Sequence, residues 1–337
     1  MIQNAERFRI TKRRILWSGA ALLAAVFILF LMFGLPDTTN TIQEEPLPAA
    51  GAAARSYTAV ETFFLRDGKH IYGKLFLPQG EAPFPLVILA HGFNGNCDKV
   101  EPYAAAYAEN GIAACVFDFI GGGEGSRSDG SILEMSVLTE AEDLNAVIDS
   151  LKHRKELDPE QFFLLGRSQG GFVASYVAEE RPQDIRAMVL LFPGFVISDD
   201  MRDLAPEPEA IPETVELMGA TIGRIYLEDA MSVDIYEKMS DYPGDVLIFH
   251  GTADTIVPLS YSERAVTAFP SAELVTIEGA GHGFIGEDEQ HVTKLSVDFV
   301  KAHLADAHLA SYSPERRKDN GRKSCLDRGQ NRTYYSG

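Results

Sequence analysis

The stretch that decides the fold is QFFLLGRSQGGFVAS, residues 161–175. Its apolar run at residues 162–165 predicts a buried strand, and the segment after Ser168 favours a helix. Between them lies the pattern Gly-x-Ser-x-Gly, in which a sharp turn places the serine at the end of the strand. The flanking glycines lack a Cβ, which lets strand and helix approach closely. The stretch therefore predicts a nucleophile elbow, with Ser168 as the nucleophile.

Short apolar segments alternate with helical patterns on both sides of this elbow. Strands are predicted at residues 57–65, 70–77, 112–118, 161–166, 186–192, 245–250 and 273–278, and a further strand opens residues 85–96. Helices are predicted at residues 99–110, 136–151, 169–180, 259–268 and 288–304. The first two strands are joined by Asp67-Gly68, a strong hairpin dipeptide. This alternation predicts an α/β fold whose central sheet is mostly parallel and covered by helices.

Two residues after later strands provide the partners that the serine needs. A serine hydroxyl is a poor nucleophile near neutral pH, so it requires a base and an acid that orients the base. Asp254 follows the strand predicted at 245–250, and His282 follows the next strand. Because the carboxyl ends of parallel strands lie at one edge of a sheet, we expect Ser168, Asp254 and His282 to meet there.

Other residues compete for these roles or suggest different chemistry. Asp229 and Asp234 are the alternatives for the acid. His250 is expected to pack within its strand, and His91 to support the loop after the third strand. The run Gly121-Gly122-Gly123 lacks the Gly-Lys-Ser/Thr that completes a phosphate-binding loop, so it predicts a flexible turn.

The reaction also needs hydrogen-bond donors for the oxyanion that forms during acyl transfer. One expected donor is the backbone N–H of Gln169, which follows the nucleophile at the start of a helix. The other is expected from the loop after the third strand, at the backbone N–H of Phe93. These two residues form the predicted oxyanion hole.

Charge and cysteine content argue against a nucleic-acid partner, a disulfide framework and a metal site. The formal net charge is −19, and nucleic-acid binding is not expected because phosphate contacts need clustered Lys and Arg. The three cysteines have no disulfide or metal-ligand spacing, and Cys115 is expected to be a buried small residue. Neither a cofactor nor a metal is expected, and the oligomeric state stays open.

The two ends of the chain differ from its middle. Residues 15–35 carry no charge and, as a helix, would reach about 30 Å, enough to cross a bilayer. The basic residues 1–14 before them predict a cytoplasmic N-terminus with the rest of the chain outside. A cleaved signal peptide, giving a secreted protein, is the alternative. Residues 36–55 suit a linker, and the basic tail at 306–337 suits a disordered segment.

Several motifs in residues 57–305 resemble those of the α/β-hydrolase superfamily, and within it the bacterial cinnamoyl and feruloyl esterases and their serine aminopeptidase-like and monoacylglycerol lipase-like relatives. They are HGFNGN (91–96), FDFIGGGEGSRSDG (117–130), GRSQGG (166–171), HGTAD (250–254) and GAGHGF (279–284). The resemblance implies a hydrolase domain over residues 56–305, with Ser168, Asp254 and His282 as nucleophile, acid and base. Arg167 departs from the histidine that is common in these relatives.

The alternation breaks at residues 195–243, which fits the helical cap that such enzymes insert over the active site. Its early part is acidic, at Asp199, Asp200, Asp203, Glu207, Glu209, Glu213 and Glu216. Apolar residues follow at helical spacing and predict an amphipathic helix over the site entrance: Val215, Met218, Ile222 and Ile225. The resemblance implies that the cap holds an aromatic acyl group, for which Phe195, Tyr226 and Tyr236 are candidates; they could equally form the core of the cap.

These features predict a membrane-anchored, extracytoplasmic serine hydrolase that cleaves carboxylic esters through an acyl-enzyme on Ser168. A serine peptidase or aminopeptidase of the same fold is the first alternative, with the acidic cap binding the positive terminus of its substrate. A catalytically inactive hydrolase fold that serves as a binding protein is the second. Function must be decided from the site, because the fold alone does not decide it.

Overall fold

The computed structural model describes residues 56–206 and 211–305. The predicted anchor at 15–35 lies outside these ranges, as do the basic N-terminus, the linker and the tail at 306–337. Within the described ranges, no helix has both the length and the apolar character needed to cross a membrane.

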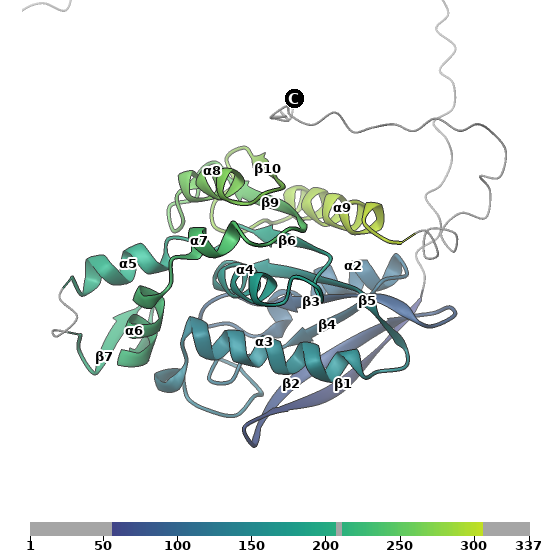
Figure 1. Cartoon of the computed structure of the whole chain (residues 1–337), viewed down its shortest axis with the longest axis horizontal. Helices are drawn as coiled ribbons and strands as arrows, with labels where there is room; N and C mark the ends of the chain where they lie inside the picture. The colour runs from purple at the N-terminus through teal and green to yellow at the C-terminus, as the bar shows by residue number, and fades with distance from the viewer. Residues whose placement is uncertain (1–55, 207–210, 306–337) are drawn as a thin grey trace, which may run out of the picture. The chain divides into compact units, whose positions relative to one another are not determined.

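Eight strands form one sheet, in the order β1-β2-β4-β3-β5-β6-β9-β10 (Figure 1). They are β1 (Tyr57–Arg66), β2 (Lys69–Pro78), β3 (Phe84–Ala90), β4 (Ala113–Phe117), β5 (Leu157–Arg167), β6 (Ala187–Leu191), β9 (Asp245–Gly251) and β10 (Ala272–Ile277). β2 is antiparallel to both of its neighbours, whereas all the other pairings in this sheet are parallel. The predicted α/β fold with a mostly parallel sheet is confirmed, and the nucleophile strand β5 lies near its middle.

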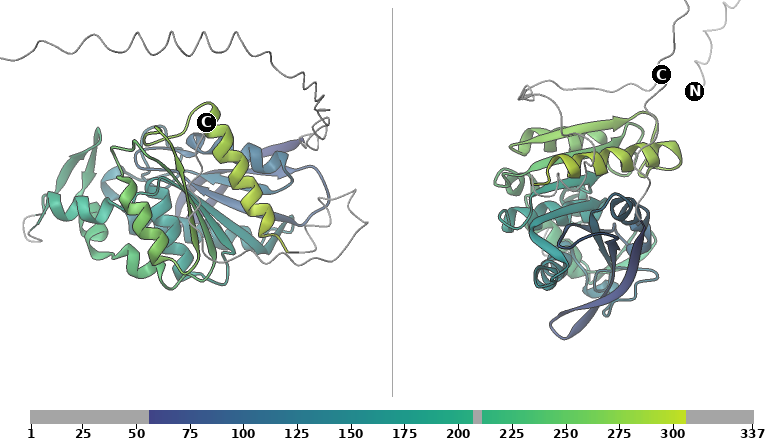
Figure 2. Two further views of the ribbon diagram at one scale, coloured as in Figure 1. Left: turned by 90° about the horizontal axis from the view of Figure 1, so that it is seen from above. Right: turned by 90° about the vertical axis from the view of Figure 1, so that its right-hand side faces the viewer.

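Helices cover both faces of this sheet (Figure 2). Successive side chains of a strand point to opposite faces, so Leu86 and Ile88 of β3 join one core while Val87 and Leu89 join the other. The first core is covered by α3 (Val137–Lys152), α4 (Gln169–Glu180) and α8 (Leu259–Ala268). The second is covered by α2 (Glu101–Glu109) and α9 (Glu287–Ala302). Every residue of β3 is buried, as expected of a strand covered on both sides.

The segment inserted after β6 contains short helices and a hairpin. Its elements are α5 (Ile197–Leu204), β7 (Thr214–Leu217), β8 (Ala220–Gly223), α6 (Arg224–Ser232) and α7 (Ile235–Met239). In Figure 1 α5, β7 and α6 lie together beside the main sheet. The segment predicted to be a helical cap thus contains α5, α6 and α7 together with a two-stranded sheet, and its place over the active site stays a prediction.

The predicted helix through Val215, Met218, Ile222 and Ile225 is wrong. Val215 and Ile222 instead face each other as partners in the antiparallel pair β7–β8. The connecting residues Met218 and Gly219 both have positive φ, 47° and 83°, which is the geometry of a two-residue hairpin turn. A helical residue needs negative φ, so this turn ends any helix at the point where the apolar spacing suggested one.

Candidate active site

Ser168 occupies the sharp turn between β5 and α4, with φ 54° and ψ −120°. A non-glycine residue in such a conformation costs of order 1–3 kcal/mol and persists only where its surroundings impose it. Leu191 of β6 accepts a hydrogen bond from the Ser168 N–H at 3.0 Å, and the Ser168 carbonyl accepts from Gly194 at 2.8 Å. A Cβ on Gly166 would lie 2.4 Å from the Gly170 oxygen, so the strand and helix meet only because glycine is present.

The structure brings the three predicted catalytic side chains together. The Oγ of Ser168 lies 2.8 Å from Nε2 of His282, and Nδ1 of His282 lies 2.8 Å from Oδ2 of Asp254. Since a carboxylate only accepts, Nδ1 carries the hydrogen and Nε2 is free to accept the serine proton. The three residues come from the loops after β5, β9 and β10, as the sequence spacing predicted.

Backbone contacts hold the acid and base loops against each other. The Ala253 N–H donates to the Ala280 carbonyl at 2.9 Å, and the Gly279 N–H donates to Thr252 Oγ1 at 2.9 Å. A Cβ on Gly251 would lie 2.2 Å from the Ala280 oxygen, so this crossing also requires glycine. The parallel pairing of β9 with β10 therefore continues into the two loops and fixes the separation of their functional side chains.

Asp254 is the acid that the structure places at His282. Its side chain is fully buried, and Oδ1 accepts from the N–H groups of Ile256 and Val257 at 2.9 and 3.0 Å. The two alternative acids are engaged elsewhere, because Asp229 accepts from Ser136 and Asp234 caps α7.

The loop after β3 lies against the nucleophile. A Cβ on Gly92 would be 3.0 Å from the Cβ of Ser168. His91 supports this loop, as predicted: its Nδ1 lies 2.8 Å from the Gly92 carbonyl, and its Nε2 accepts from the Phe119 N–H at 3.2 Å. Complete burial lowers the pKa of His91, so this side chain is neutral, with its hydrogen on Nδ1.

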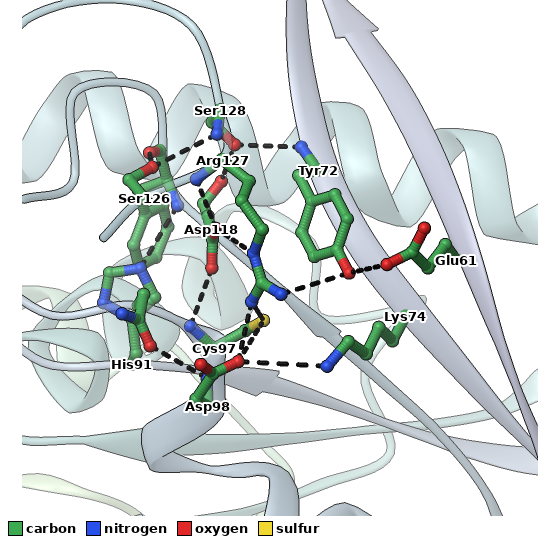
Figure 3. A network of polar contacts seen from close by, with 12 residues as sticks. Glu61, Tyr72, Lys74, His91, Cys97, Asp98, Asp118, Ser126, Arg127 and Ser128 are labelled. Atoms are coloured by element: carbon green, nitrogen blue, oxygen red, sulfur yellow. Dashed lines mark hydrogen bonds and ion pairs between the residues drawn. The ribbon is translucent and has the colours of Figure 1, made fainter.

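A network of polar contacts ties this loop to the loop after β4 (Figure 3). Its centre is the buried carboxylate of Asp118, which accepts from the Cys97 N–H at 2.7 Å and from the Arg127 N–H at 2.7 Å. The Arg127 guanidinium lies 4.0 Å from the centre of the Tyr72 ring and donates to Asp98 at 2.7 Å. Neither Asp118 nor Arg127 was singled out from the sequence as a positioning residue, since their contacts span loops distant in the chain.

One predicted oxyanion donor, Gln169, follows Ser168 in the chain, and the other, Phe93, belongs to the loop that approaches Ser168. Gln169 is the first residue of α4, where a backbone N–H has no acceptor within the helix. Phe93 follows Gly92 in the loop that approaches the serine. The positive end of the α4 dipole also faces this point. These positions are compatible with an oxyanion hole formed by Phe93 and Gln169, which stays a prediction.

The three candidate substrate contacts separate into two groups. Tyr226 of α6 is close to the predicted oxyanion hole, because its hydroxyl donates to Gln169 Oε1 at 2.5 Å and its ring lies 5.8 Å from that of Phe93. Tyr236 points toward α8, where its hydroxyl donates to the Tyr261 carbonyl at 3.0 Å. Phe195 is buried with its ring 6.1 Å from Tyr236. Tyr226 is therefore the candidate whose side chain contacts both Gln169 and Phe93.

A buried acid lies behind Gln169. Glu140 of α3 is only 1% exposed, and neither of its carboxyl oxygens has a hydrogen-bond partner in the described part of the chain. Burial raises the pKa of Glu140 well above its ordinary value, and nearby Asp143 adds to that rise. The Gln169 side chain opposes the rise but does not cancel it. Glu140 therefore holds its proton to higher pH than an exposed glutamate does.

The residues beside the site do not suit a metal ion. In residues 56–206 and 211–305, one group of side chains has its potential metal-ligand atoms within 4.8 Å of one another: Cys97, Asp98 and Glu101. Lys74 donates to Glu101, and Arg127 donates to both Cys97 and Asp98. Burial raises the pKa of Cys97, which opposes the thiolate that a metal would need. Side chains that are already paired with cations make a poor metal site.

Two family models and a curated relative match this chain. A family model described as "Serine aminopeptidase, S33" matches residues 81–234, and one described as "TAP-like protein" matches residues 230–308. The uncharacterized protein YfhR of Salmonella typhi is 32% identical over 262 residues, which are 72% of this chain and 82% of that protein.

Two solved structures are similar over most of their own length. Est1E from Butyrivibrio proteoclasticus, solved with ferulic acid bound, is 25% identical with a TM-score of 0.66 and covers 72% of this chain and 98% of its own. The monoacylglycerol lipase of Paleococcus ferrophilus is 19% identical with a TM-score of 0.54 and covers 69% of this chain and 99% of its own. At that identity, the second likeness shows the fold alone.

Proposed function

The chain belongs to the α/β-hydrolase superfamily, and from this premise we propose that it is a serine hydrolase that cleaves carboxylic esters. The observation that carries the proposal is the hydrogen-bonded series from Ser168 through His282 to Asp254, at distances of 2.8 and 2.8 Å, on a strained elbow. A serine in a merely structural turn requires neither a base at its hydroxyl nor a buried carboxylate behind that base.

The geometry suits a two-step acyl transfer. Ser168 Oγ attacks the ester carbonyl carbon while His282 Nε2 takes the hydroxyl proton. The carbonyl oxygen becomes an oxyanion, toward which the Phe93 and Gln169 N–H groups would donate. The C–O bond to the alcohol then breaks, and the alcohol leaves with the proton from His282. A water attacks the acyl-enzyme by the same route and releases the carboxylic acid.

Esters are favoured over peptides by two observations. Est1E, which is 25% identical to this chain, binds ferulic acid, the acid product of an ester. The acidic residues of α5 are partly engaged already: Asp199 accepts from the Tyr261 hydroxyl at 3.0 Å and from Arg202 at 3.2 Å. An aminopeptidase would need such carboxylates for the substrate amine, and the matching aminopeptidase family model keeps this the alternative.

The proposal is tested by comparing the protein with its Ser168→Ala variant on nitrophenyl esters, methyl ferulate, a monoacylglycerol and aminoacyl-nitroanilides. We expect ester cleavage that falls about 10³-fold or more in the variant, and inert anilides. Anilide cleavage would make the protein a peptidase. Turnover by the variant at the wild-type rate would remove Ser168 from the mechanism, and no turnover by either protein would favour a binding role.

We further propose that residues 15–35 anchor the chain in the cell membrane, with the hydrolase domain outside the cytoplasm. The support is the uncharged length of this segment and the basic residues before it. Full-length protein should remain with membranes after a carbonate wash, and protease added outside intact cells should cut the domain. Recovery in the medium of a form that begins after residue 35 would instead indicate a cleaved signal peptide.

A further inference from the structure

His250 is a buried histidine that takes no part in the steps above. It belongs to β9 and is 0% exposed. Its Nε2 lies 2.8 Å from the Val257 carbonyl oxygen, and its Nδ1 lies 2.7 Å from Ser262 Oγ. A carbonyl oxygen can only accept, so Nε2 carries the hydrogen, and Nδ1 accepts from the serine hydroxyl. Both nitrogens are therefore occupied in a single tautomer.

The hydrogen-bearing nitrogen of this histidine also faces the acid. Nε2 of His250 lies 3.3 Å from Oδ2 of Asp254, the oxygen that accepts from His282 Nδ1 at 2.8 Å. The other oxygen of Asp254 is held by two backbone N–H groups. The His250 N–H group donates to the Val257 carbonyl, and in the described part of the chain it is also the side-chain N–H group nearest to Oδ2 after that of the base. A buried carboxylate whose orientation matters gains from each such donor.

The neutral state of His250 suits this position. Burial lowers its pKa, and the nearby His282 lowers it further, against the opposing effect of the Val257 carbonyl and Asp254. A neutral imidazole donates a hydrogen bond without adding a positive charge. It therefore does not compete with the imidazolium that His282 becomes during the reaction, which Asp254 must stabilise.

We propose that His250 is a positioning residue which, with Ser262 behind it, fixes Asp254 Oδ2 in the orientation that His282 requires. The proposal rests on the proposed function, because it assumes that Ser168, His282 and Asp254 act together. It extends the series of side chains in polar contact to five: Ser262, His250, Asp254, His282 and Ser168. Loss of His250 should slow the chemical step and leave substrate affinity nearly unchanged.

The test measures how fast a fluorophosphonate modifies Ser168, because this reaction needs the base but no knowledge of the natural substrate. The Ser168 Oγ–P bond forms, the P–F bond breaks, and His282 takes the hydroxyl proton. The variants are His250→Leu, His250→Gln, whose amide nitrogen retains a donor, and Ser262→Ala. His303→Leu is the matched control, because His303 also contacts a carbonyl, that of Phe299, and a carboxylate, that of Asp245, but away from the site.

We expect the maximal modification rate of His250→Leu to be about 10- to 100-fold below wild type, because the variant loses the N–H group that lies 3.3 Å from the charged Asp254 oxygen. The half-saturating probe concentration should stay within about threefold. His250→Gln should recover most of this rate, and His303→Leu should match wild type. A folded His250→Leu protein that reacts at the wild-type rate overturns the proposal. The proposal is also overturned if His303→Leu loses modification rate to the same extent, or if His250→Gln does not recover the rate.

Two other outcomes concern a His250 variant that does not fold and a wild-type protein that cleaves no ester. If His250→Leu does not fold, Ser262→Ala decides: a rate about three- to tenfold below wild type supports the proposal, and a wild-type rate overturns it. Wild-type protein that reacts with the probe but cleaves no ester refutes the esterase function, while the ratio of variant rates still tests His250.

Discussion

Replacing Glu140 with glutamine should stabilise the protein, and the gain should grow with pH. Because the pKa of Glu140 is raised by burial, the folded protein binds a proton here that the unfolded chain releases above about pH 4.5, the ordinary pKa of the group. Folding then becomes less favourable by about 1.4 kcal/mol for each pH unit above that value, until the raised pKa is reached. Glutamine has nearly the same shape and no proton to lose, so Glu140→Gln avoids this cost.

The measurement is urea unfolding of both proteins at pH 5, 6, 7 and 8. The difference in unfolding free energy should be small at pH 5 and should widen by up to about 1.4 kcal/mol per unit. Asp143 lies close by, with a pKa raised to about 7 by burial, but both proteins carry it and its direct contribution cancels in the difference. The control is Glu109→Gln on the exposed end of α2, which should stay within about 0.5 kcal/mol of wild type at every pH. A difference independent of pH would refute a raised pKa for Glu140.

Three further predictions concern the loops, the cap and the base. Asp118→Ala should destabilise the protein by about 3 kcal/mol in urea unfolding, because it leaves the buried Cys97 N–H without its acceptor; an effect below about 1 kcal/mol would contradict the role given to this network. Gly219→Val should cost about 1–2 kcal/mol, because φ of 83° disfavours a β-branched residue, and equal melting temperatures would argue against the β7–β8 turn. His282→Ala should lower esterase kcat/KM by about 10³-fold or more, because Ser168 then has no base to accept its proton. Activity at the wild-type level in this variant would exclude His282 as the base.

The sequence predicted the elements that have strong local signals. Helices α4 and α8 begin and end where their apolar periodicity placed them, at 169–180 and 259–268. The meeting of Ser168, Asp254 and His282 could also be anticipated, because each follows a strand and parallel strands share one edge for their carboxyl ends.

What the sequence did not predict depends on contacts between distant segments. Asp118 and Arg127 resemble ordinary loop residues until the loop after β3 folds against them. His250 was expected to pack within its strand, and its contacts with Asp254 and Ser262 emerge only when the chain turns back through α8.

The cap shows a different limit of sequence reasoning. Val215, Met218, Ile222 and Ile225 satisfied a helical spacing, while the pairs Val215/Leu217 and Ala220/Ile222 alternate as in strands. Periodicity does not separate a helix from a strand over so short a segment. The pair Met218-Gly219, with two positive φ values, decides for the hairpin. Glycine at the second position was the local signal that favoured a turn, and it outweighs the spacing of four apolar side chains.

The sheet order has a consequence for how the protein would lose activity. The nucleophile strand β5 lies in the interior, whereas the acid and base follow β9 and β10, the last two strands at one edge. Edges of a sheet open more readily than its centre, since they have fewer neighbours to hold them. Heat should therefore separate His282 and Asp254 from an intact Ser168 before the central strands part. Inactivation would then precede the loss of secondary structure, and it would reverse on cooling as long as the interior of the sheet survives.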